Sequence, residues 1–144
     1  MKDVLIKIKG IQEPDSSQNE AIEFSTDGKM EINEDTITIF YNEGEMLEGA
    51  DIKTKMQIIG NHTVITERNG SMNSRLVVQK GVRNTCFYST PYGELSMGIY
   101  GEEIENDLNS NGGKLKMKYS IDTNLSLLSK NEVEITVREI ETEV

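Results

Sequence analysis

An alternation of apolar and polar side chains with a period of two limits what this chain can fold into more than any other feature of its sequence. The pattern is clearest in residues 114–121, where the apolar positions are Leu115, Met117, Tyr119 and Ile121. Successive side chains of a β-strand point to opposite faces, so such a segment predicts a strand with one buried face. No helical pattern of similar strength runs through the chain, and we therefore expect an all-β protein.

The same alternation predicts strands along most of the chain. It is found in residues 3–11, 36–41, 53–59, 62–68, 74–79, 85–89, 94–104 and 133–138, in addition to 114–121. Residues 36–41 are also rich in β-branched and aromatic side chains, which favour strands. Together with shorter apolar pieces near Phe24 and Met30, these segments predict nine to eleven strands.

Residues between the predicted strands have the chemistry of turns. Gly60-Asn61 and Asn69-Gly70 each predict a tight hairpin, so residues 53–79 should form a three-stranded meander. The segment 26–29, Thr-Asp-Gly-Lys, predicts another turn, which would end the strand around Phe24.

Glycines and short connections favour closure of the sheet into a barrel. Gly98 and Gly101 fall inside the predicted strand 94–104, where glycine often marks a bulge or a tight bend, and small barrels need such corners. A flat sheet of sequential antiparallel strands would leave two open edges, which closure removes. A sandwich would need longer crossings. We therefore predict one domain over residues 1–144, folded as a closed antiparallel up-and-down β-barrel.

The charge of the chain narrows the classes of partner. Its 15 basic and 25 acidic side chains give a formal net charge of −10, so its field repels phosphate backbones and anionic membrane surfaces. We expect neither nucleic acid nor a membrane as partner. The amino-terminal residues lack the apolar run of a secretory signal, and the single cysteine, Cys86, cannot form an intrachain disulfide. These features favour a cytoplasmic protein.

Four short motifs, in their order and spacing, resemble a known family. They are residues 37–43 (Ile-Thr-Ile-Phe-Tyr-Asn-Glu), 68–70 (Arg-Asn-Gly), 88–93 (Tyr-Ser-Thr-Pro-Tyr-Gly) and 112–119 (Gly-Gly-Lys-Leu-Lys-Met-Lys-Tyr). The pattern is similar to that of the uncharacterised bacterial YwiB-like family, domain of unknown function 1934. The resemblance implies a calycin-like β-barrel, related in shape to lipocalins and fatty-acid-binding proteins. It implies no reaction, because no activity is established for the family.

Glu43 and Arg68 are the candidate charged residues of the barrel interior. Glu43 continues the alternating face that includes Tyr41, and Arg68 shares a face with Val64 and Thr66. If these faces point inward, the two charges either form an ion pair at one end of the barrel or are each solvated there. Alternatively, Arg68 binds an anionic ligand that Glu43 or a tyrosine orients, because a guanidinium fits a carboxylate through two hydrogen bonds.

Tyrosines and a threonine are the other candidate ligand-binding residues. Placed at the mouth of a barrel, each tyrosine offers apolar area and one hydroxyl. The same residues can instead be core and corner residues whose hydroxyls bond to the backbone. The full candidate ligand-binding set is Arg68, Glu43, Tyr41, Tyr88, Thr90, Tyr92 and Tyr119.

The sequence lacks the known signatures of catalysis. It has no phosphate-binding loop, dinucleotide fingerprint, nucleophile elbow or zinc-protease helix. We interpret His62 as an exposed turn residue and Cys86 as a small core residue. One histidine and one cysteine do not make a zinc site. We expect no metal and no cofactor, and the sequence favours a non-enzymatic role without excluding an enzyme.

A barrel of this kind fits two classes of function. In the first, the lumen holds a small apolar or amphiphilic anionic molecule, as barrels of about eight or more strands can. In the second, the barrel is solid and serves as an interaction or structural module that binds a protein partner. A lumen filled by Met56, Met97, Met117 and the tyrosines would exclude the first class.

Overall fold

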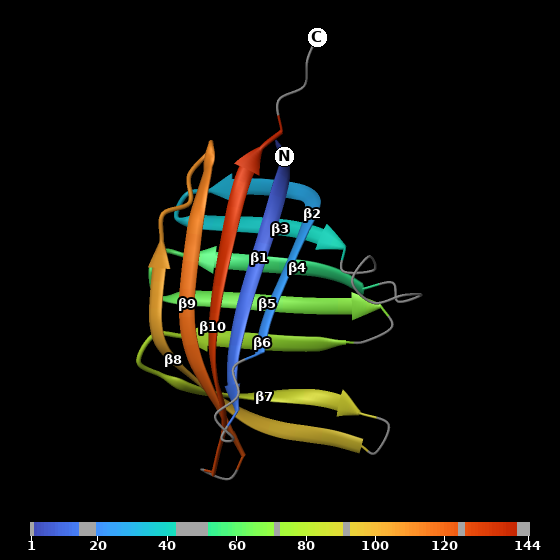
Figure 1. Cartoon of the computed structure of the whole chain (residues 1–144), viewed down its shortest axis with the longest axis vertical. Coiled ribbons are helices and arrows are strands. Elements are labelled where there is room, and N and C mark those ends of the chain that lie inside the picture. The colour runs from blue at the N-terminus through green and yellow to red at the C-terminus, as the bar shows by residue number, and fades with distance from the viewer. Residues whose placement is uncertain are drawn as a thin grey trace.

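The structure, a computed structural model, describes residues 2–14, 20–42, 52–70, 73–90, 93–123 and 126–140, with side chains for all of these except 12–14, 20–22, 87–90, 94, 95 and 126–128. Within these ranges, ten strands follow one another (Figure 1). They are β1 Lys2–Pro14, β2 Glu20–Asn33, β3 Thr36–Asn42, β4 Ile52–Ile59, β5 Thr63–Gly70, β6 Ser74–Gln79, β7 Arg83–Thr90, β8 Gly93–Asn106, β9 Gly112–Thr123 and β10 Ser126–Glu139. No described segment is a helix long and apolar enough to cross a membrane.

The ten described strands close into an antiparallel barrel. Each strand pairs with the next one in sequence, and β1 pairs with β10. In Figure 1, β9, β10 and β1 run upright as one layer, and β3 to β6 run across them behind. The predicted all-β fold and closed barrel are therefore confirmed, with a strand number inside the predicted range.

The barrel closes least tightly between β6 and β7. Ser74 opposite Tyr88 is the one paired position between these two described strands. Each of the two strands is otherwise held by its other neighbour, β6 by β5 and β7 by β8.

The turn predicted at residues 26–29 is wrong, because β2 runs through this segment without a break. Gly28 pairs with Val4 of β1 on one side and with Tyr41 of β3 on the other. Here β2 leaves the upright layer and enters the layer that crosses it (Figure 1). A strand that joins two layers has to bend, and a glycine permits the bend without a side chain in the way. The turn-like sequence thus marks a strand corner.

Of the two predicted hairpins, one is confirmed and the other is wrong. β4 and β5 join at the predicted Gly60-Asn61 turn, where Gly60 has a φ of 53°. In the next hairpin Arg68 pairs with Ser74, so the connection is longer than the predicted Asn69-Gly70 turn. Gly70 instead extends β5, because it still pairs with Ile52 of β4. The meander of β4, β5 and β6 is confirmed.

Alternate side chains point into the barrel and form one apolar core. Leu115, Met117 and Tyr119, predicted to share the inner face of β9, are all buried. Val4 and Ile6 of β1 are fully buried as well. Removal of this apolar area from water, at about 25 cal/mol per Å², is the main force that holds the two layers together.

A bulge in β8 keeps its apolar side chains inside the barrel. The register between β8 and β9 shifts between Gly101 and Glu103. Ile99 and Ile104 lie an odd number of residues apart, yet both are buried, because the bulge adds one residue to the strand. The bulge predicted from Gly101 is confirmed.

Gly98 makes room for an ion pair that spans three strands. It pairs with Thr85 of β7 and with Asp122 of β9 without a shift in register. The guanidinium of Arg83, in β7, occupies the place that a Cβ at Gly98 would take. Its Nε and Nη2 atoms donate hydrogen bonds to Asp122 at 3.1 and 2.6 Å. A side chain at position 98 would therefore displace Arg83.

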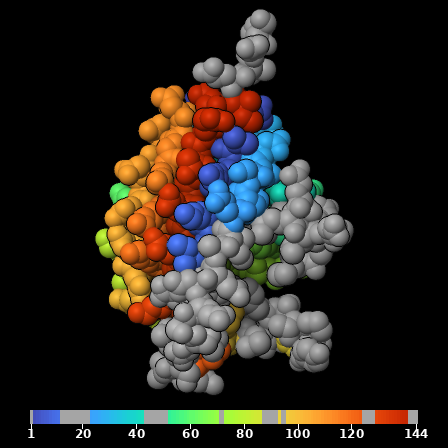
Figure 2. Space-filling view, in the orientation of Figure 1, coloured from blue at the N-terminus to red at the C-terminus, as the bar shows by residue number. Residues whose placement is uncertain are grey.

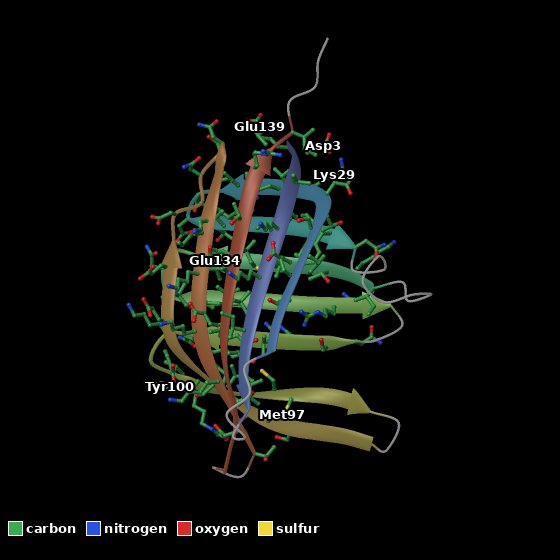
Figure 3. All side chains as sticks on the ribbon, in the orientation of Figure 1. Asp3, Lys29, Met97, Tyr100, Glu134 and Glu139 are labelled. Atoms are coloured by element: carbon green, nitrogen blue, oxygen red, sulfur yellow. The ribbon has the colours of Figure 1, made fainter. Side chains whose placement is uncertain are left out.

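Ion pairs join neighbouring strands on the outer surface, where β9, β10, β1 and β2 form one continuous face (Figure 2). Lys29 of β2 lies 2.8 Å from Asp3 of β1, and Lys114 of β9 lies 2.7 Å from Glu134 of β10. Figure 3 shows Asp3 and Lys29 side by side near the amino terminus, with Glu134 further along the barrel. The hydrogen bond from Lys114 lowers the pKa of Glu134, and that from Lys29 lowers the pKa of Asp3.

We expect the contribution of Glu134 to stability to disappear in acid. A carboxyl with a lowered pKa stabilises the fold above its unfolded-state pKa, and this stabilisation is lost as the pH falls through the folded-state pKa. Glu134→Gln should therefore lower the melting temperature slightly at pH 7, as is usual for exposed pairs, and match the wild type near pH 3.

Melting curves of the two proteins between pH 7 and about pH 3 measure this difference. Glu34→Gln, in the exposed turn between β2 and β3, is the control and should follow the wild type throughout. A difference for Glu134→Gln that stays constant with pH would show that its loss of stability does not come from the charge.

Candidate ligand site in the barrel lumen

A half-open cavity of about 210 Å³ lies in the barrel lumen. Both layers line it, with Met56 and Leu76 from the crossing layer and Met117 from the upright layer. Its polar lining comes from Tyr41, Thr66, Arg68 and Tyr119. Among the described residues, methionines and tyrosines thus line the lumen and leave it partly open.

A larger depression of about 700 Å³ lies on the outer surface beside the end of β10, bordered by Leu5, Asn111 and Arg138. The lumen cavity is the better candidate site although it is smaller. Ligand sites are concave, mostly apolar and provided with a few convergent polar groups, and the lumen has this combination.

The polar side chains of the crossing layer stand in one row across the sheet. Tyr41 of β3 pairs with Thr54 of β4, and Thr54 pairs with Arg68 of β5. Arg68 pairs with Ser74 of β6, which pairs in turn with Tyr88 of β7. Residues directly opposite each other on antiparallel strands point to the same face. The register therefore gathers Tyr41, Thr54, Arg68 and Ser74 on the lumen side of the layer.

Two hydroxyls in this row have no hydrogen-bond partner within the described part of the chain. They are Thr54 Oγ1 and Ser74 Oγ, and both atoms are buried. Neither residue was among the candidates from the sequence. In the alternating segment 53–59, Thr54 falls on the same face as Met56 and Ile58. This alternation is the sequence signal that could have identified Thr54.

The structure brings together three of the residues predicted for the site. Tyr41 and Arg68 line the cavity from the crossing layer, and Tyr119 lines it from β9. The Tyr41 ring also packs against Phe24, with ring centroids 6.3 Å apart. Burial of both tyrosines leaves their hydroxyl ends as polar points in an apolar wall.

The other predicted site residues are described in part or not at all. Tyr88 and Thr90 belong to β7, which places their backbone but not their side chains. Glu43 and Tyr92 lie outside the described residues. An ion pair between Glu43 and Arg68 therefore stays a prediction.

The residues considered for nucleophilic or metal chemistry lie apart from the cavity lining. His62 is exposed in the β4–β5 turn and its Nδ1 is 2.7 Å from Thr63 Oγ1. Cys86 is buried in the core of the barrel. No group of three or more His, Cys, Asp or Glu side chains that could hold a metal ion occurs in the described ranges.

Known proteins share both the sequence pattern and the fold of this chain. The model of a family described as a domain of unknown function, DUF1934, matches residues 6–135. The uncharacterized β-barrel protein YwiB of Bacillus subtilis (strain 168) is 27% identical over 120 residues, which are 82% of this chain and 80% of that protein. The crystal structure of the ywiB protein from Bacillus subtilis covers 97% of this chain and 93% of its own, with a TM-score of 0.84 at 20% identity, which shows the same fold. The resemblance found in the sequence motifs is confirmed, and the chain belongs to the DUF1934 family.

Proposed function

We propose that the barrel binds a small amphiphilic molecule in its lumen and holds the anionic end of that molecule at Arg68. The observation that carries the proposal is the cavity of about 210 Å³ with Arg68 in its otherwise mostly apolar wall. Apolar walls favour a hydrocarbon portion, and a guanidinium favours a carboxylate or a similar oxyanion. In this proposal the partner is a small molecule in the cytoplasm, and neither a membrane nor nucleic acid is involved.

The size of the cavity limits the ligand. Pockets for drug-sized molecules usually measure about 300–1,000 Å³, so this lumen suits a smaller molecule. At about 30 Å³ for each water molecule in the liquid, the cavity corresponds to roughly seven water-sized groups. A longer chain would extend out of the cavity through its open side.

The test is native mass spectrometry of the protein purified from its own cells, compared with the same sample after denaturation. We expect an additional mass in the native sample that is lost on denaturation. A ligand-free mass, together with no response to a panel of small amphiphiles in thermal shift and calorimetry, would contradict the proposal.

Replacement of Arg68 should weaken binding of the small molecule. Truncation of one partner of a buried, hydrogen-bonded charge pair typically costs about 2–5 kcal/mol of binding free energy, so we expect Arg68→Ala to weaken binding at least about thirtyfold. Arg75→Ala removes the same charge from the neighbouring strand, where the Arg75 side chain is 63% exposed. This control should keep the wild-type affinity, and equal losses in both variants would point to a general effect of charge.

A further inference from the structure

We propose that Thr54, Arg68 and Ser74 form a head-group site for a carboxylate, which makes the ligand of the lumen a short-chain monocarboxylic acid. The inference rests on the binding function proposed for the lumen and gives its ligand a chemical class. It starts from the two buried hydroxyls, Thr54 Oγ1 and Ser74 Oγ, that lack a hydrogen-bond partner among the described residues.

The two hydroxyls flank Arg68 in the sheet. Thr54 and Ser74 are each directly opposite Arg68 in the register, one on β4 and the other on β6. Neighbouring strands are about 4.8 Å apart, and opposite residues share a face. Three side chains that can donate hydrogen bonds therefore stand next to one another on the lumen side, and Arg68 borders the cavity.

A buried hydroxyl without a partner destabilises the protein that contains it. Thr54 is only 2% exposed, so bulk water does not satisfy its hydroxyl. A ligand that brings acceptor atoms to this row supplies the missing hydrogen bonds. Neither hydroxyl is part of the cavity wall, so the head group reaches them only when a side chain of the wall moves aside. The unbranched side chain of Met56, two residues from Thr54 on the same face of β4, can adopt other rotamers.

The three donors define the head group by charge and by hydrogen-bonding capacity. Arg68 has donors only and a positive charge, so the ligand group that it binds has to be an acceptor and is best an anion. A carboxylate accepts two parallel hydrogen bonds from a guanidinium and keeps lone pairs for the two hydroxyls. A phosphate monoester can carry a second negative charge, whose desolvation the single Arg68 would not compensate. A monoanionic carboxylate therefore fits best.

The rest of the cavity defines the tail. Met56, Leu76 and Met117 present apolar surface to the space beside the row. A volume of about 210 Å³ holds a head group and only a short hydrocarbon chain. We therefore expect acids of about the size of hexanoate, at roughly one heavy atom for each water-sized group.

The first experiment compares three probes on the full chain by isothermal titration calorimetry: hexanoate, 1-hexanol and hexyl phosphate. We expect hexanoate to bind at least about tenfold more tightly than either of the others, a difference of about 1.4 kcal/mol. Equal affinity for hexanoate and hexanol would overturn the carboxylate site and leave lumen binding intact. Binding of none of the three, together with a ligand-free mass for the native protein, would overturn the proposed function itself.

The second experiment uses two opposite effects of the same variant. Thr54→Val removes the unpartnered hydroxyl at constant shape, so it should raise the melting temperature of the ligand-free protein by about 4 °C. Thr54→Val should also weaken hexanoate binding about tenfold. Ser74→Ala should weaken hexanoate binding to a similar extent. A hydroxyl with a purely structural hydrogen bond would give a lower melting temperature and an unchanged affinity.

Matched variants separate the head-group site from the general effect of a buried threonine. Thr54→Ser keeps the hydroxyl and should keep the hexanoate affinity. Thr38→Val changes a threonine that is also buried, at 8% exposure. Thr38 lies on the opposite face of β3 from Tyr41, so this change should leave hexanoate binding unchanged. Wild-type affinity in both Thr54→Val and Ser74→Ala would overturn the inference.

Discussion

Gly28→Ala should destabilise the barrel by about 2–3 kcal/mol, although it adds a single methyl group. A Cβ at this position would overlap the carbonyl oxygen of Phe40 and lie 2.7 Å from Ile6 Cδ1. The Phe40 oxygen is part of the backbone of β3, so it cannot move without a shift of β3 relative to the corner in β2. Equilibrium unfolding in urea, with the midpoint and slope fitted separately, measures the loss.

Gly98→Ala is the matched control because it makes the same change inside another strand. The Cβ would meet the guanidinium of Arg83 there, which is the far end of a flexible side chain. Arg83 can swing away and lose its hydrogen bonds to Asp122, so we expect a much smaller loss of stability, reduced further at high salt. Equal losses of unfolding free energy in the two variants would show that overlap with the backbone of Phe40 is not what destabilises Gly28→Ala.

The alternation of side chains predicted the strands, because most strands have one face in the core and one toward solvent, and the short connections between the strands predicted closure into a barrel. Residues 114–121 show this directly, since their apolar positions are buried or partly buried in β9. The corner at Gly28 was missed for a physical reason. A turn and a strand corner both need a residue without a bulky side chain, and only the pairing of Gly28 with both β1 and β3 distinguishes them.

The sequence predicted only those residues of the candidate site that could be assigned to the inner face of a strand from its alternation. Arg68 and Tyr41 were found because they continue inward alternations, and both line the cavity. Thr54 and Ser74 were missed, since a threonine or serine in a strand is conspicuous only when its buried hydroxyl lacks a partner. Whether a hydroxyl has a hydrogen-bond partner depends on how side chains from several strands pack around it. The sequence alone does not show this packing.

Met56→Ala should enlarge the lumen cavity at a cost of about 3 kcal/mol in the free energy of unfolding. The side chain is 4% exposed and borders the cavity, so its removal takes away buried apolar atoms and leaves their space empty. Ile32→Ala, which truncates a side chain that is 39% exposed, is the control and should change stability by less than about 1 kcal/mol. Urea unfolding of the ligand-free proteins measures both values.

The same variant should change which acid the protein prefers. Met56→Ala removes about three heavy atoms from the wall of the cavity, so the best-bound acid should lengthen by two or three methylene groups, from about hexanoate toward nonanoate. Calorimetry with a series of straight-chain acids gives this optimum for the wild type and for both variants. A loss of stability with no change in the preferred chain length would place the hydrocarbon tail away from Met56, because a ligand packed against that wall has to sense the space left by its removal.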